Sequence, residues 1–413
     1  MASLTSAGVL WPQIEELAEF TAEPGAAGVT REVFTAPYMA ACQWLAGLME
    51  QAGLAVRSDS FGNLFGRLEG EDPAAAVVMS GSHIDTVPDG GRFDGTLGVL
   101  GAIEAVRQLR AGDWRPRRSV EVVAFAGEEP RFGKGCIGSR AMTGTLARDA
   151  LETLRDRSGT TLAEAMRACG LDPDELAAAQ IDPKRVHAFV ELHIEQGVVL
   201  ETRGLPIGLV THIAAQHAMR VVMRGEPGHA GATPMGLRRD ALAAAAEVVL
   251  AVERLAQQAP SGTAVGTVGA IGARPGAINV VAGEAELLVD IRDRELGART
   301  ETLEALLGEI EAIAARREVG YEIETISSDE PLTASPLVLG AAREACDRLA
   351  VEYTEMISGA VHDSIILGRQ VPIGMIFVPS RAGVSHSPLE YSEPEDLERG
   401  ALVLAETLRG LAA

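Results

Sequence analysis

Four short apolar runs in the sequence each lead directly into a cluster of polar residues. Such continuous apolar runs are typical of strands that are buried on both faces of a sheet. Helical spacing of apolar residues between them, as at 99–109 and 162–168, predicts strands that alternate with helices in an open α/β sheet. The runs cover residues 75–79, 120–126, 188–192 and 373–378, and the polar clusters that follow contain Ser80 to Asp85, Gly127 to Glu129, His193 to Gln196 and Ser385 to Ser387.

Two other stretches have a different pattern. Apolar residues recur at helical spacing in 16–20 and 39–52, so residues 1–70 are expected to be mostly helical. Residues 213–328 predict the order strand, helix, strand, strand, helix, strand, which is that of the ferredoxin-like split motif. The strands are expected at 217–223, 263–271, 278–291 and 321–326, and the helices at 240–257 and 300–316.

This order predicts a discontinuous two-domain chain. Its 413 residues are enough for two domains. Because polar clusters of the first kind return after the ferredoxin-like stretch, residues 213–328 are interpreted as an α+β domain inserted into a first domain of residues 1–212 and 329–413.

Charge and composition narrow the class of partner. The chain has 36 Lys and Arg against 58 Asp and Glu, a formal net charge of −22. Nucleic acids and anionic membranes require a basic face, so neither is expected as a partner. No apolar run approaches the ~18–20 residues that span a bilayer. The first basic residue is Arg31, so no secretory signal is expected, and four scattered cysteines fit a reducing cytoplasm.

The polar clusters contain the residue types of a transition-metal site. Asp94 follows His83 by eleven residues, and a glycine-rich loop allows the two to meet. Glu128 and Glu129 are adjacent, so that one can bind a metal while the other faces water. Imidazole with carboxylate suits Zn²⁺, Mn²⁺, Co²⁺ or Ni²⁺. A single histidine at a strand end is usually structural and paired acids are usually solvated, but four such clusters at four strand ends favour a metal site.

Together these motifs resemble the amidase/hydantoinase-carbamoylase family of dinuclear metal hydrolases. The similarity runs from about residue 10 to 410, and two motifs, Gly-Gly-Arg-Phe-Asp-Gly and His-Ile-Glu-Gln-Gly, are specific to this branch. The motifs are Gly81 to Asp85, Gly90 to Gly95, Glu128 to Gly133, Ile137 to Arg140, Glu191 to Gly197, Gly228 to Met235 and Ser385 to Pro388.

The resemblance implies a zinc-exopeptidase-like catalytic domain, whose open mixed sheet is flanked by helices, with a lid and dimerisation domain. It also implies two divalent metal ions per subunit, Zn²⁺ or Mn²⁺, Co²⁺ or Ni²⁺. Glu128 is the implied general base for a metal-activated water. The implied metal ligands are His83 and His193 for one ion, Glu129 and His386 for the other, and Asp94 as the bridge, with Asp85 orienting His83.

Substrate contacts are also implied by the resemblance. Gln196 hydrogen-bonds the amide or ureido group, and His229 stabilises the oxyanion, either in its own chain or across a homodimer formed by residues 213–328. The substrate is a small carboxylate. Residues implied or expected to contact it are Asn279 and Arg292 at the carboxylate, Gly359 at the backbone, and His217. For Arg292, an internal ion pair with Asp290 or Asp293 is the alternative.

Two departures from the family pattern concern the pocket. The loop between Glu129 and Arg131 is one residue shorter than usual, and Val361 stands where the family more often has Gly, which narrows the pocket.

The leading hypothesis is hydrolysis of an N-carbamoyl-L-amino acid to the amino acid, CO2 and NH3. Alternatives are allantoate amidohydrolase, β-ureidopropionase, and an N-acyl-amino-acid hydrolase or dipeptidase, against which Gln196 argues. A non-catalytic binding protein is a further alternative, disfavoured because Glu128 and all five ligands are present.

Overall fold

The computed structural model describes residues 8–112 and 114–413, and residues 1–7 of the N-terminal stretch tested for a signal lie outside them. The chain divides into two compact units. The first comprises the described residues up to Thr211 with Ala334–Met356 and His362–Ala413, and the second comprises His212–Thr333 with Ile357–Val361. The domain boundaries at 212/213 and 328/329 remain a prediction from the sequence. The short segment 357–361 had no sequence signal.

The first unit is built on a mixed sheet in the order β1-β2-β4-β3-β5-β15-β6, with β14 paired to β6. The strands are β1 (Ala55–Ser58), β2 (Leu64–Leu68), β3 (Val77–His83), β4 (Val120–Phe125), β5 (Val186–Ile194), β6 (Ile207–Ile213), β14 (Tyr353–Ser358) and β15 (Ile373–Val378). The four central strands β4, β3, β5 and β15 are parallel, and the outer pairings are antiparallel.

These four central strands are the four apolar runs of the sequence. Every residue of β3, β4 and β15 is buried, as expected for strands covered on both faces. In the register, His83 pairs with Phe125 and Phe377 with His193, so the strands end together. The polar clusters therefore emerge along one edge of the sheet.

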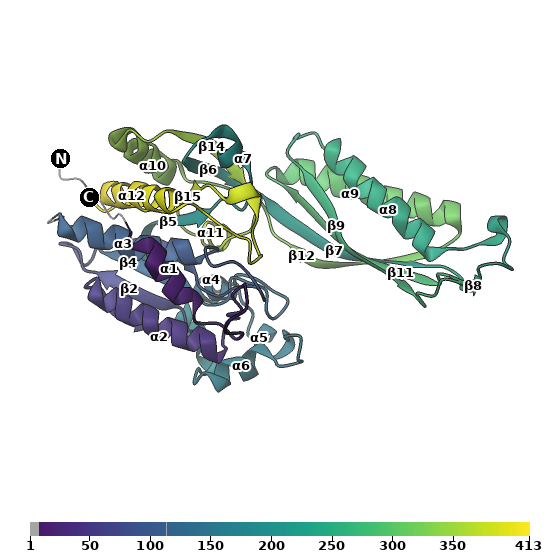
Figure 1. The fold of residues 1–413 in the computed structure, drawn as a ribbon, viewed down its shortest axis with the longest axis horizontal. Helices are drawn as coiled ribbons and strands as arrows, with labels where there is room; N and C mark the ends of the chain where they lie inside the picture. Colours follow the sequence, from purple (N-terminus) through teal and green to yellow (C-terminus); the bar gives the residue numbers. More distant parts are fainter. Residues whose placement is uncertain (1–7, 113) are drawn as a thin grey trace. The chain divides into compact units, whose positions relative to one another are not determined.

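Helices pack against this sheet, and α3 and α12 contact each other (Figure 1). Nearly all of α3 is buried, and it contacts β3 and β5. The helices of this unit are α1 (Leu10–Ala18), α2 (Ala36–Gln51), α3 (Thr96–Ala111), α4 (Ile137–Met142), α5 (Ala150–Thr153), α6 (Leu162–Ala168), α7 (Val199–Arg203), α10 (Pro336–Leu349), α11 (Asp363–Leu367) and α12 (Pro394–Leu411), with 3₁₀ turns at Pro173–Ala179, Pro183–Arg185 and Arg381–Gly383.

The expectation that residues 1–70 are mostly helical missed two strands. β1 and β2 form an antiparallel hairpin whose turn is held by the Asp59 carboxylate. This carboxylate accepts the backbone N–H groups of Phe61, Gly62 and Asn63 at 2.9–3.0 Å. β1 is short and largely exposed, so it lacks an apolar run that a periodicity argument could detect.

The second unit contains a four-stranded antiparallel sheet in the order β12-β7-β11-β9, with a βαββαβ order of elements. Helices α8 and α9 pack against each other and against this sheet. Both the mixed sheet of the first unit and the ferredoxin-like α+β insert are therefore confirmed. The elements are β7 (Ala215–Arg224), β8 (Gly228–His229), α8 (Ala241–Gln257), β9 (Val265–Arg274), β10 (Val280–Val281), β11 (Glu284–Asp293), α9 (Leu296–Arg317), β12 (Gly320–Ser328) and β13 (Leu332–Thr333), with a 3₁₀ turn at Met235–Leu237.

Long apolar helices of the kind that cross a bilayer do not occur within residues 8–112 and 114–413.

A substitution of Gly81 in β3 can test how closely β3 and β4 pack. A Cβ at Gly81, where φ is +154°, would lie 1.8 Å from the carbonyl oxygen of Val123 in β4. We expect Gly81→Ala to destabilise the first unit by at least ~2 kcal/mol, because neighbouring backbones would have to separate. In α2, Gly47 has no heavy atom within 4 Å of its Cβ position, so Gly47→Ala should raise stability by ~0.5–1 kcal/mol. Thermal unfolding measures both, and equal melting temperatures for the two variants would contradict the register.

Candidate functional site

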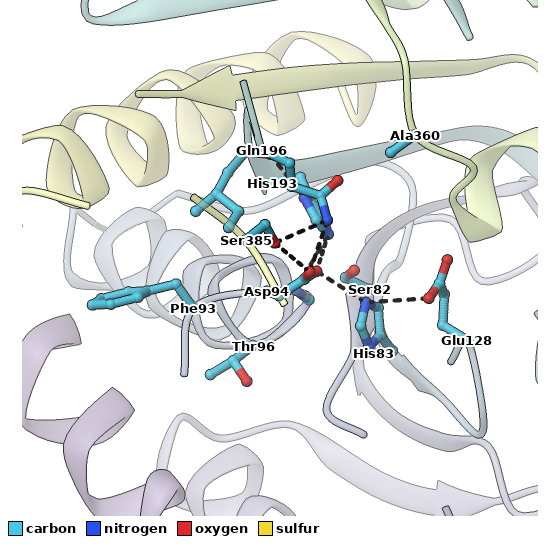
Figure 2. Close-up of polar contacts among 12 residues, drawn as sticks. Ser82, His83, Phe93, Asp94, Thr96, Glu128, His193, Gln196, Ala360 and Ser385 are labelled. Carbon is cyan, nitrogen blue, oxygen red and sulfur yellow. Dashed lines mark hydrogen bonds and ion pairs between the residues drawn. The ribbon is translucent and has the colours of Figure 1, made fainter. Parts of the chain in front are cut away.

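The polar clusters of the first unit meet around one buried carboxylate, that of Asp94 (Figure 2). Its Oδ1 lies 3.5 Å from Nε2 of His83 and 3.2 Å from Nε2 of His193. Its Oδ2 lies 3.2 Å from Nε2 of His386, which in turn is 3.4 Å from Oε1 of Glu129. The two oxygens of Asp94 thus face two different sets of ligands.

These residues fit a pair of divalent cations. His83, Asp94 and His193 offer ligand atoms within 4.8 Å of one another, and so do Asp94, Glu129 and His386. Both groups combine imidazole nitrogen with carboxylate oxygen, the donors that zinc and its first-row neighbours prefer. The groups share Asp94, so one carboxylate belongs to both.

The electrostatics of the cluster point the same way. Burial alone would raise the pKa of Asp94, but its hydrogen bonds with three imidazoles hold that pKa well below the usual range. Burial raises the pKa of Glu128 well above its ordinary value, against the opposing effect of His83. Burial, reinforced by the charge of Asp94, raises the pKa of Glu129 to about 7. Carboxylates that burial makes difficult to ionise are stabilised as anions by a bound cation.

Glu128 lies beside this cluster without belonging to either group. Its Oε2 is 3.8 Å from Nε2 of His83, and its Oε1 is 3.7 Å from Sγ of Cys136. The adjacent Glu129 points to His386, so the two neighbouring acids face different partners, as expected from the sequence. A carboxylate in this position can exchange protons with a molecule held at the cluster.

Asp85 contacts His83 in a way that the sequence did not predict. Its backbone carbonyl oxygen is 3.0 Å from Nδ1 of His83, whereas its carboxylate is 3.8 Å away. That carboxylate accepts the backbone N–H groups of Gly127, Glu128 and Glu129 at 3.0–3.3 Å. Asp85 therefore fixes both the ring of His83 and the loop that carries the paired acids.

Gln196 extends the cluster on the side of β5. Its Nε2 donates to Oδ2 of Asp94 at 2.7 Å, and its backbone is left-handed, with φ of +57°. Its Oε1 is buried and has no hydrogen-bond partner among the described residues. Such a strained residue with an unpaired acceptor is typical of a functional site.

Several residues of this region were missed by sequence reasoning. Ser385 donates to Asp94, and Glu390 accepts from the backbone of Phe93 and Asp94. A third group, Glu191, His193 and His362, lies in the same region. The only indication for Ser385 and Glu390 in the sequence was that they are close to His386. Nothing in the local sequence indicates that their side chains reach Asp94 or its loop.

The candidates of the second unit lie in two places. His229 in β8 pairs with Val280 of β10, next to Asn279. Nδ1 of His229 accepts the N–H groups of Gly231 and Ala232, both at 3.1 Å. The ring proton is therefore on Nε2, which makes His229 a hydrogen-bond donor at its exposed end.

The other place is on the four-stranded sheet, at the end of β11 that lies away from β8 and β10. Nη1 of Arg292 donates to the carbonyl of Gly359 at 2.8 Å, and its Nη2 pairs with Asp290 at 2.8 Å. The ion pair with Asp290, which was the alternative considered from the sequence, is thus present. Arg292 is still partly exposed, and it contacts Gly359, another candidate substrate-binding residue. His217 lies one register position away, opposite Ile291.

The two places are far apart within one chain. Where β11 pairs with β7, Glu284 lies opposite Arg224 at one end and Arg292 lies opposite Gln216 at the other. Strand β8 follows Arg224 in the chain. Eight residue steps at ~3.3 Å place these ends ~26 Å apart. His229 and Arg292 of one chain therefore cannot both contact one amino-acid-sized molecule.

The two departures from the family pattern are also visible. After Glu129 the chain makes a tight turn, in which Arg131 donates its N–H to the Glu129 carbonyl at 2.9 Å. The Arg131 side chain pairs with Asp156 at 2.9 Å. A Cβ at Gly359 would meet no atom of the described residues within 4 Å, so the protein's own packing does not require glycine there. Val361 is partly buried in the same segment.

Comparisons with known proteins identify the family to which the chain belongs. Residues 79–410 match the profile of Peptidase family M20/M25/M40. The N-carbamoyl-L-amino acid amidohydrolase of Geobacillus stearothermophilus is 46% identical over 98% of both chains. The ureidoglycolate hydrolase of Arabidopsis thaliana is 41% identical over 97% of this chain and 85% of its own. Among solved structures, a hydantoinase/carbamoylase family amidase from Burkholderia multivorans has a TM-score of 0.88 at 33% identity, covering 98% of this chain and 97% of its own.

The contacts of Asp85 lead to a prediction. Asp85→Asn replaces one acceptor oxygen with an N–H₂ group that faces backbone donors, so the loop of Glu128 and Glu129 should shift. We expect activity or metal affinity to fall ~10–100-fold. Asp59→Asn is the matched control, because Asp59 holds three backbone N–H groups in a turn that contains no candidate residue. Steady-state kinetics and metal content measure the difference, and equal losses in both variants would contradict the assignment.

Proposed function

Because the chain belongs to Peptidase family M20/M25/M40 and is a metal-dependent amidohydrolase of the hydantoinase/carbamoylase type, we propose that its substrate is an N-carbamoyl-L-amino acid. Hydrolysis of the ureido C–N bond yields the amino acid, CO2 and NH3. The observation that carries the reaction is the position of Glu128, a mostly buried carboxylate 3.8 Å from a histidine of the Asp94 cluster. The substrate class rests on the 46% identical relative, which matches along the whole chain.

Five residues would hold the metal. His83 and His193 would hold one divalent ion, Glu129 and His386 would hold a second, and Asp94 belongs to both candidate groups. Divalent ions bound there supply Lewis acidity, which lowers the pKa of a water molecule and polarises a carbonyl group. The ions are Zn²⁺, Mn²⁺, Co²⁺ or Ni²⁺, in keeping with mixed imidazole and carboxylate ligands.

Glu128 moves the proton. Its carboxylate takes a proton from the attacking water and delivers it to the nitrogen that leaves the carbonyl carbon. Burial raises the pKa of Glu128, which makes it a stronger base than a solvated glutamate. The C–N bond breaks as that nitrogen is protonated, and the amino acid is released.

Gln196 favours a ureido group over a simple acyl group. Its Nε2 is engaged by Asp94, while its buried Oε1 is free to accept a hydrogen bond. The terminal NH₂ of a carbamoyl group supplies that donor, whereas an acetyl methyl group would leave Oε1 unpaired. A site built around such an acceptor discriminates strongly against a substrate that lacks the donor.

The second unit contributes carboxylate and oxyanion contacts. Arg292 binds the substrate carboxylate, and Gly359 and His217 border it. Asn279 lies beside His229 and contacts the carboxylate from the same copy of the chain as His229, whose Nε2–H stabilises the oxyanion. Because ~26 Å of strand separates His229 from Arg292, His229 serves the site of a second copy. A homodimer through the second unit, in the cytoplasm, completes the proposal. Apolar side chains exposed on this unit are available for the contact: Met235, Leu237, Ile271, Ile278 and Leu288.

Ureidoglycolate is the second candidate substrate. It is also a ureido compound with a carboxylate, and the 41% identical plant relative is named for its hydrolysis. Val361 beside Gly359 favours a short side chain in the pocket, which suits either substrate.

A substrate panel tests this proposal. N-carbamoyl-L-amino acids should be turned over with the highest kcat/KM, above ureidoglycolate, allantoate, N-carbamoyl-β-alanine and N-acetyl amino acids. Chelation with EDTA should abolish activity, and Mn²⁺, Co²⁺, Ni²⁺ or Zn²⁺ should restore it. Higher kcat/KM for N-acetyl amino acids, or full activity after complete metal removal, would contradict it.

Substitution of the base gives a second prediction. Glu128→Gln keeps the size of the side chain but cannot take a proton, so kcat should fall by ~10²–10⁴-fold with unchanged metal content. Glu121→Gln is the matched control, since Glu121 is a buried acid on β4, the strand that precedes Glu128, but pairs with Arg57 and Arg67. Rate measurements with metal analysis separate the two. Normal turnover by Glu128→Gln would place the base elsewhere.

The dimer proposal gives a third prediction. An inactive Glu128→Gln chain and an inactive His229→Ala chain are mixed, dissociated and reassociated. If His229 acts across the dimer, each hybrid has one intact site, so about a quarter of wild-type activity should return. Hybrid formation is confirmed by differential tagging. No recovery in confirmed hybrids would place His229 in its own chain's site or outside the reaction.

A further inference from the structure

Glu390 is a buried acid that none of the assigned roles uses. It follows His386 by four residues and lies in the loop between β15 and α12. Only 4% of it is exposed, whereas the adjacent Leu389 is 78% exposed. The carboxylate therefore points into the protein from a loop at its surface.

The contacts of Glu390 lead to Asp94. Its Oε1 accepts the backbone N–H of Phe93 at 2.9 Å and that of Asp94 at 3.1 Å. Its Oε2 lies 2.9 Å from the hydroxyl of Ser385, and that hydroxyl lies 3.0 Å from Oδ2 of Asp94. Glu390 thus holds the backbone of Asp94 directly and its carboxylate through one serine.

The chain leaves a space that fits this carboxylate. A Cβ at Gly91 would lie 2.0 Å from Oε1 of Glu390 and 2.1 Å from its Cδ. Only glycine at position 91 leaves room for it. The second glycine of the Gly90-Gly91 pair is therefore explained by a residue almost 300 positions later.

The carboxylates of Glu390 and Asp94 repel each other when both are charged, so hydrogen bonds to Glu390 must offset this repulsion. Burial, and next the negative charge of Asp94, raise the pKa of Glu390. Two N–H donors compensate for placing this acid beside another, and the one proton of the Ser385 hydroxyl is donated to either Glu390 or Asp94. Glu390 also joins the loop of Asp94 to the loop of His386, whose Nε2 is 3.2 Å from Oδ2 of Asp94.

We infer that Glu390 is a positioning residue that holds Asp94 and His386 at the separation needed to bind a divalent cation together with Glu129. This inference rests on the proposed metal-dependent function. Of the two candidate cation groups, it concerns the one that contains His386, whose side chain is 53% exposed. The other group also contains Asp94, but its two histidines, His83 and His193, are buried near the ends of β3 and β5, which hold them independently of the Glu390 loop.

The inference distinguishes two substitutions of Glu390. Glu390→Ala removes the acceptor of two buried N–H groups, so the Asp94 loop should move and the weaker ion should bind ~10–100-fold less tightly. Glu390→Gln keeps an acceptor oxygen for these N–H groups, and its amide can donate to Ser385. We therefore expect the Gln variant to bind both ions within about threefold of the wild type.

The experiment is a calorimetric titration of metal-free protein with Mn²⁺, with bound metal counted by mass spectrometry after gel filtration. Gly91→Ala is the second variant, because it should displace Glu390 without removing it. Glu406→Ala is the matched control: Glu406 is an equally buried acid on α12, paired with Arg348 and Arg409.

We expect the wild type, Glu390→Gln and Glu406→Ala to bind two ions. Glu390→Ala and Gly91→Ala should bind one of the two ions with reduced affinity. Activity of the weakened variants should recover in excess Mn²⁺, which a folding defect would not do. Wild-type affinity for both ions in Glu390→Ala, or an equal loss in Glu390→Gln, would overturn the inference alone. Failure of the wild type to bind any ion would overturn the proposed function as well.

Discussion

The buried carboxylate of Asp94 is the constraint on which the first unit is organised. It lies between three imidazoles, and those contacts hold its pKa well below the usual range, whereas burial alone would raise that pKa. The histidines come from β3, from β5 and from the loop after β15, so their meeting requires three parallel strands to end at the same level. Strand register, loop length and the paired acids after β4 are therefore linked through one negative charge.

Loops around that charge are held by carboxylates that accept backbone N–H groups. Asp85 accepts three from the segment 127–129, Glu390 accepts two from 93–94, and Glu195 accepts those of Val199 and Leu200 at the start of α7. Each replaces regular secondary structure with a few charge-assisted hydrogen bonds. Part of the chain's acidic excess thus serves loop geometry rather than the surface.

Sequence reasoning was effective where one local pattern determines one element. The apolar runs predicted β3, β4, β5 and β15, and the 162–168 pattern coincides with α6, whose capping box of Thr161 and Glu164 fixes its start. The expected strand 278–291 is instead two strands, β10 and β11, with a turn at 282–283.

What sequence reasoning missed depends on contacts between distant residues. Strand β1 of the β1–β2 hairpin is largely exposed and has no apolar periodicity. The contact of Glu390 with Gly91 joins positions that only the folded sheet brings together. The places of the histidines and paired acids at strand ends marked them as candidates, and the family resemblance implied the set of five ligands. The contacts of the Asp85 carboxylate with the 127–129 loop could be seen only in the folded structure.

The ends of the inserted unit have a consequence for how such a chain could arise. Ile213 pairs with Leu332 and His212 with Thr333, so the chain enters and leaves the insert at adjacent points. An insertion whose ends already touch closes a loop that the parent fold had to close anyway, so its entropic cost is small. Because its two ends are adjacent, the insert can be exchanged as one continuous segment. An ancestral exchange of 214–331 for another domain, or for a short turn, would leave the strand pairing at its base intact.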